Sequence, residues 1–150
     1  MAPGPAAAAQ TCENGAMRGA ALHPTLTPER RRALFLLGIK LFNRGAFFDA
    51  HEAWEEIWRS REPEPRDLFQ GLIQTAAAMH HVLGGRLGAA RRVLARGLAR
   101  LAPFAPASHG LDIGALLLAG RRWESWLAES RGEAAPPPPV VRVVDAFAVR

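Results

Sequence analysis

The stretch from Leu68 to Leu83 contains no aspartate, glutamate, lysine or arginine. Its apolar residues recur almost all round a helix rather than on one face, which is typical of a helix surrounded by protein. The stretch is shorter than the roughly 20 apolar residues that a membrane-spanning helix requires. The sequence therefore predicts a central buried helix, and a chain of 150 residues is long enough to supply the helices that cover it.

Proline and glycine divide the rest of the chain into further helical segments. Thr27, Pro28 and Glu29 give a helix start, with a hydroxyl N-cap, a proline at the first helical position and an acid in the first turn. Gly45 is a natural C-terminal stop for this helix. The predicted helices cover about 27–44, 46–61, 66–83, 87–101 and 112–129.

The two ends of the chain differ from this helical region. Residues 1–26 are rich in alanine, glycine and proline without a periodic apolar pattern, and are predicted to be a flexible, disordered lead-in. Residues 27–130 form the predicted helical domain, and 131–150 an extended tail that begins with a four-proline run. The valines that follow either dock on the helical body or pair as a lone strand. The predicted fold class is all-α, a compact bundle of about five helices.

The composition excludes several protein classes. Cys12 is the only cysteine, which excludes a disulfide framework and a cysteine metal cluster within one chain. The N-terminus lacks the basic start and leucine-type core of a signal peptide. We therefore expect a cytoplasmic protein without membrane association.

The predicted helix over 46–61 carries polar residues among aromatic ones. At 100° per residue, His51 and Glu55 fall on the same face as Trp54 and Trp58. Polar groups that face a core need partners, because an unpaired buried charge is strongly destabilising. The predicted helix over 66–83 carries a narrow polar stripe that could meet them. The predicted polar cluster comprises His51, Glu52, Glu55, Gln70, Gln74 and His81.

Three interpretations of this cluster remain open. In the first, it is a satisfied core network in which glutamine amides fix the helix register. In the second, it is a small-molecule or catalytic site, with Glu55 as base and His51 as its orienting partner. In the third, His51, Glu55 and His80 or His81 bind a metal ion. The spacing departs from the H-E-x-x-H zinc motif because Glu55 replaces the second histidine, and no cofactor is required by the sequence.

The positive charge of the chain is concentrated in one segment. No acidic residue occurs between Asp67 and Asp112, and on the helix over 87–101 Arg92, Arg96 and Arg100 form a stripe opposite the apolar face. This stripe is either a solvated surface or a binding site for an anionic partner such as nucleic acid. Neither interleaved aromatic residues nor a known nucleic-acid motif supports the second interpretation.

The segment 41–59 resembles a small prokaryotic helical family, domain of unknown function number 309. Its pattern is F-N-x-G-x-[FY]-[FY]-[DE]-A-H-E-x-x-E-x-x-W, and the resemblance extends over about residues 30–128. It implies a compact helical bundle and no established activity. One departure is Gly85-Arg86, where members often carry glycine–asparagine, so a possible capping side chain is lost. The positions that the motif singles out are Asn43, Gly45, His51, Glu52, Glu55, Trp58, Gln70, Gly71 and Gln74.

These features together favour a non-catalytic binding or adaptor module with a protein or small-molecule partner. The first alternative is a hydrolytic or acid–base enzyme that uses His51 and Glu55, with or without a metal ion. The second is an anion-binding or nucleic-acid-binding protein that uses the arginine stripe.

Overall fold

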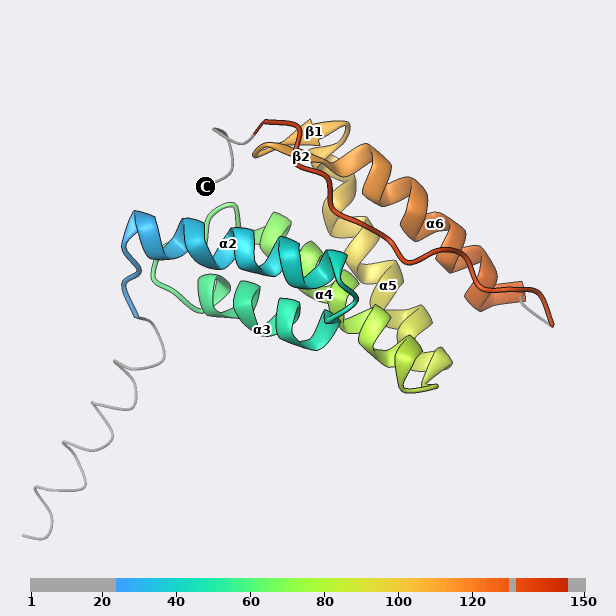
Figure 1. Cartoon of the computed structure of the whole chain (residues 1–150). Helices are drawn as coiled ribbons and strands as arrows, with labels where there is room; N and C mark the ends of the chain where they lie inside the picture. The colour runs from blue at the N-terminus through green and yellow to red at the C-terminus, as the bar shows by residue number, and fades with distance from the viewer. Residues whose placement is uncertain (1–23, 130–131, 146–150) are drawn as a thin grey trace, which may run out of the picture.

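The computed structural model describes residues 24–129 and 132–145, and it confirms the predicted all-α bundle (Figure 1). The predicted lead-in, including Cys12, lies almost entirely outside the described residues. Two helices, over 66–83 and 87–101, have the predicted bounds. The principal helices are α2 (Pro28–Asn43), α3 (Phe47–Trp58), α4 (Arg66–Leu83), α5 (Leu87–Leu101) and α6 (Ile113–Glu129).

Two helical hairpins with the same type of turn form the first part of the fold. After α2, Gly45 adopts a φ of +81°, its N–H bonds to Phe42 O, and the N–H of Ala46 bonds to Leu41 O. After α4, Gly85 adopts a φ of +72°, and the two equivalent backbone hydrogen bonds form at this turn. This is the Schellman arrangement, which requires a left-handed residue that only glycine adopts without strain.

Helix α4 lies in the middle of the fold, with α3 on one side and α5 on the other (Figure 1). Its core-facing residues, among them Leu68, Phe69 and Leu72, are fully buried. Thr75 is also buried, and its hydroxyl donates to Gly71 O at 2.8 Å, so this polar side chain is satisfied within the helix. The prediction of a buried central helix is confirmed.

Glycines set how closely the helices approach. A Cβ on Gly97 of α5 would lie 3.0 Å from Thr75 N and 3.1 Å from Gly71 O, so α4 and α5 touch backbone to backbone. A Cβ on Gly38 of α2 would lie 2.1 Å from Trp54 Nε1, so the indole occupies the space of the missing side chain. The indole N–H donates to Phe35 O at 3.2 Å, which satisfies a fully buried donor.

Several features differ from the prediction. Helix α3 ends at Trp58 rather than near 61, because the chain turns at Ser60, whose hydroxyl donates to Ile57 O. Between α5 and α6 lie a 3-10 turn (Ala102–Phe104) and an antiparallel hairpin of β1 (Ala107–Ser108) and β2 (Leu111–Asp112) that the sequence did not predict. Each strand has only two residues, too few to produce an alternating pattern.

Helix α6 begins as predicted, since Asp112 Oδ1 accepts from Ala115 N at 2.9 Å. The chain then turns back alongside α6 toward β2 (Figure 1). We call residues 133–145 the strap. The predicted docking of its valines occurs, because Val141 is buried, whereas the pairing is limited to a single bridge between Val143 and Leu111. Within residues 24–129 and 132–145, every helix is too short or too polar to cross a bilayer.

Candidate functional site

The polar residues of α3 lie at the edge of its buried face. Ala50, Trp54 and Ile57 take the fully buried positions. The side chains of His51 and Glu55 remain 22% and 20% exposed, so they border the core rather than lie within it. The reason is angular: Trp54 and Glu55 are 100° apart on the helix, and α3 turns only the tryptophan inward.

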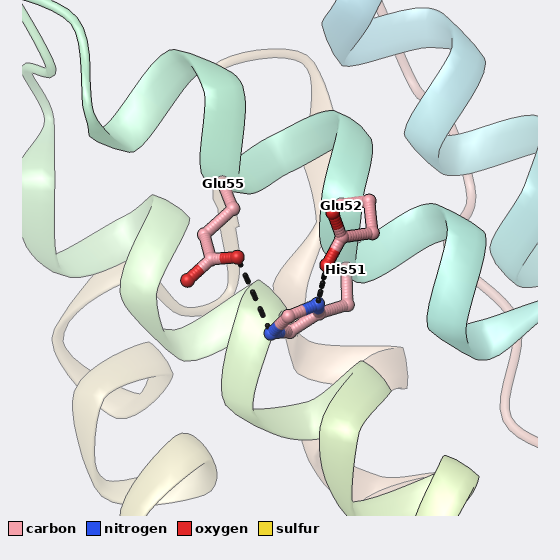
Figure 2. Close-up of side chains that lie close together, drawn as sticks. All are labelled: His51, Glu52 and Glu55. Atoms are coloured by element: carbon pink, nitrogen blue, oxygen red, sulfur yellow. Dashed lines mark ion pairs between the residues drawn. The ribbon is translucent and has the colours of Figure 1, made fainter. Parts of the chain in front are cut away.

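The imidazole of His51 lies between two carboxylates of the same helix (Figure 2). Its Nδ1 is 3.3 Å from Glu52 Oε1, and its Nε2 is 3.7 Å from Glu55 Oε2. These contacts are ion pairs only when the imidazole is protonated. The second oxygen of Glu55 accepts from Arg59 Nη2 at 3.1 Å, one turn further along, which holds this carboxylate in place.

The cluster leaves one of its own polar atoms unsatisfied. His51 Nδ1 is buried, yet its 3.3 Å approach to Glu52 lacks the alignment of a hydrogen bond. The imidazole also stacks with Phe48, whose ring centroid lies 5.9 Å away. Phe48 in turn packs against His80 at 5.2 Å. A buried nitrogen without a hydrogen-bond partner is uncommon in native structures.

The other predicted members of the cluster, which α4 carries, do not join it. Among the described residues, no hydrogen bond links Gln70 or Gln74 to His51 or Glu55, and the buried Gln74 Oε1 has no partner. His81 lies at the end of α4, where its Nδ1 accepts from Arg86 Nε at 3.0 Å. Burial, and next to it the charge of Arg86, lowers the pKa of the His81 imidazole.

Trp58 adds a second unsatisfied atom on α3. Its indole N–H is buried without a hydrogen-bond partner. The guanidinium of Arg66 covers the ring at 4.5 Å, a cation–π contact across the turn between α3 and α4. Neither this contact nor the role of Arg59 was predicted from the sequence. The i,i+4 spacing of Glu55 and Arg59 is a signal that would have identified the second.

The cluster has the donor set of a metal site. His51, Glu52 and Glu55 each offer one ligand atom, and these atoms all lie within 4.8 Å of one another. Nitrogen and carboxylate oxygen together suit zinc and other divalent transition metals. The predicted ligands His80 and His81 are not part of this group, whereas Glu52, predicted only as a polar neighbour, is.

The arginine stripe of α5 is divided. Arg100 donates to Asp67 Oδ1 at 2.8 Å, so this guanidinium is partly neutralised by α4. Arg92 and Arg96 are exposed. Two of the three predicted side chains of the stripe are therefore exposed without this pairing.

A pocket of about 740 Å³ lies at the start of α2 and contains no residue of the cluster. Its wall includes Arg31, whose guanidinium donates to the carbonyl oxygens of Glu62 and Glu64. Burial lowers the pKa of Arg31. The Arg31 guanidinium in this pocket is thus engaged with the α3–α4 loop, and the pocket is separate from the His51 cluster.

Residues 35–93 match a family model described as Domain of unknown function (DUF309), in agreement with the predicted resemblance. The match is shorter than the predicted span of 30–128 and covers most of the two helical hairpins. No curated protein and no solved structure matches the chain.

Proposed function

We propose that the protein is a binding module whose α3 cluster binds a divalent transition-metal ion. The cluster lies within residues 35–93, which match a domain of unknown function. The observation that carries the proposal is the group of three ligand atoms, from His51, Glu52 and Glu55, within 4.8 Å of one another. Two carboxylates next to one imidazole attract a cation, and one ring nitrogen of His51 would complete the ligand set.

The surroundings suit binding more than catalysis. Glu55 is already held by Arg59, which fixes it as a ligand and engages one of the oxygens that a general base would use. Glu52 is 53% exposed, so its side chain can adjust to the ion. A hydrolytic role for His51 and Glu55 is the alternative, because three protein ligands leave positions at which an ion could activate water.

Metal binding can be measured by calorimetric titration of Zn²⁺ and by the visible spectrum of bound Co²⁺. We expect one ion per chain, with affinity that falls as the pH is lowered and protons compete for the imidazole. His51→Ala and Glu55→Gln should weaken binding at least about tenfold, because each removes a ligand.

Glu56→Gln is the matched control, since Glu56 is a neighbouring carboxylate that pairs with Arg30 outside the cluster. This variant should keep the affinity of the unaltered protein. Equal Zn²⁺ affinity in all three variants, or no stoichiometric binding at all, would contradict the proposal.

A further inference from the structure

The strap is docked along its whole length through its backbone. Trp126 Nε1 donates to Glu133 O at 3.1 Å, and Trp123 Nε1 donates to Pro137 O at 2.9 Å. Further along, the side chain of Asn43 bonds to both backbone groups of Val141. Its Nδ2 donates to Val141 O at 2.9 Å, and its Oδ1 accepts from Val141 N at 2.7 Å. None of these contacts depends on a side chain of the strap.

The two tryptophans complement a proline-rich segment chemically. Prolines 136 to 139 have no N–H, so their backbone can only accept hydrogen bonds. An indole can only donate, and its flat apolar ring suits the extended conformation that prolines favour. The edge-to-face pair of Trp123 and Trp126, with ring centroids 5.5 Å apart, therefore has the features of a surface that recognises extended proline-rich peptides.

The strap makes specific apolar contact at only a few points. Val141 is 2% exposed, and Pro139 is also buried. Between α6 and the strap a pocket of about 250 Å³ remains, lined by Leu118, Ala119 and Arg122 together with the strap itself. Leu118 is 57% exposed, so the segment leaves part of the surface beneath it unfilled. A surface that its own segment does not fill can accept another segment with larger side chains.

The far end of the strap uses strand pairing. Arg142 O accepts from Asp112 N at 2.9 Å, and Val144 N donates to Gly110 O at 2.8 Å, so the strap adds to β2 as a short third strand would. Addition of an extended peptide to an exposed strand edge is a second common mode of peptide recognition.

We infer that the face formed by α6, Asn43 and β2 is a binding site for an extended proline-rich peptide, and that the strap occupies it in cis. The required ligand is a proline run followed, two residues after its end, by a buried aliphatic residue at the position of Val141. This site is distinct from the His51 cluster and does not depend on the proposed metal ion.

The test uses the full chain with a specific protease sequence inserted between the exposed residues Gly132 and Glu133. After cleavage, the freed segment should remain associated in gel filtration and exchange with a fluorescent peptide of residues 133–145. The uncut protein should bind this peptide much more weakly, because the covalently attached strap competes at high effective concentration.

Matched peptides test the recognition itself. A peptide with Val141→Asp should bind the cleaved protein at least about tenfold more weakly, because it buries a charge at the aliphatic position. A peptide with Val144→Asp is the control and should bind nearly as well, since Val144 is 58% exposed. A peptide with the four prolines replaced by alanine should also bind less tightly, since it must pay more conformational entropy.

Dimers of the cleaved or uncut chain that exchange their straps would support the inference, because they show recognition in trans. Loss of helical circular dichroism on cleavage would overturn it, since the strap would then be part of the folding core. Release of the segment without rebinding, or equal binding of both aspartate peptides, would overturn it as well.

Discussion

The hairpins α2–α3 and α4–α5 share their turn and differ in their interior. Residues 40 apart in the chain take the same places: Gly45 and Gly85 close the first helix, and Ala50 and Ala90 are both fully buried in the second. The repeated turn follows from backbone geometry alone, because the same left-handed glycine supports the same pair of hydrogen bonds. A shared turn therefore does not require a shared core.

The interiors reach close packing in different ways. In the first hairpin, Gly38 makes room for the indole of Trp54. In the second, Gly71 and Gly97 bring the two backbones into contact. The first interface is set by one large side chain and the second by the absence of side chains, so the two should respond differently to added volume.

The outer faces differ in charge. Helix α3 carries Asp49, Glu52, Glu55 and Glu56 and no lysine or arginine, whereas α5 carries four arginines and no acid. The candidate metal site lies on the first, and the anion-binding alternative depends on the second. The same hairpin architecture thus presents opposite charges on either side of α4.

The largest expected effect is at the backbone contact of the second hairpin. Gly97→Val should destabilise the protein by about 3 kcal/mol or more, because its Cβ would meet backbone atoms that cannot rotate away. Urea unfolding followed by circular dichroism measures the change. Gly88→Ala on the same helix is the control: its Cβ would meet only Arg92 at 3.6 Å, so we expect no loss and a gain of up to about 1 kcal/mol. Equal effects of the two substitutions would remove the distinction between the interfaces.

A smaller effect, a coupling energy between two substitutions, is expected when two side chains in the interior of the first hairpin are replaced by those of the second. The positions of Gly38 and Trp54 correspond to Ala78 and Leu94, which are also buried. Gly38→Ala alone should cost about 2 kcal/mol by overpacking, and Trp54→Leu alone about 3 kcal/mol by leaving a cavity. The double variant should be more stable than the sum by about 1 kcal/mol or more, because the smaller side chain makes room for the methyl group. Additive unfolding energies would show that the two positions are not a matched pair.

The smallest effect is expected at the turns that join the two helices of each hairpin, where Arg86 of the second hairpin corresponds to Ala46 of the first. Arg86→Ala should raise the pKa of His81 toward the ordinary 6.5, although burial, the larger cause, remains. The folded protein binds a proton at His81 less readily than the unfolded chain does. Its free energy of unfolding therefore falls as the pH drops below about 6.5, and the variant should lose less of this free energy than the unaltered protein. NMR titration of the His81 ring measures the shift. Arg91→Ala, which removes an exposed arginine of the same helix, should leave it nearly unchanged, and an equal shift would exclude a specific role for Arg86.

Much of the helical framework could be predicted because its signals are local. The start at Thr27 and the stop at Gly45 depend on neighbouring residues only, and the side chain of Thr27 accepts from Arg30 N as expected of an N-cap. The β1–β2 hairpin depends instead on tertiary contacts, since Asp112 bonds to the distant Arg142. A pairing that is stabilised by another part of the chain leaves no periodic pattern in its own residues.

The candidate site was predicted in part. The i,i+4 spacing of His51 and Glu55 was sufficient to place them together, because one helix carries both. Their relation to Gln74 and His81 depends on the rotation of α3 against α4, which the sequence does not specify. Helical periodicity also does not determine whether Trp54 or Glu55 is the residue that enters the core. In the structure Trp54 does, because Gly38 leaves space for its indole.

The proline run of the strap has a consequence for spectroscopy. Four successive residues without an amide proton give no signal in experiments that follow backbone N–H groups, so amide hydrogen exchange cannot detect motion of this part of the strap. The indole protons of Trp123 and Trp126 point at carbonyl oxygens of the strap and resonate apart from the crowded amide region. These two protons therefore serve as natural reporters of whether the segment is seated, without any added label.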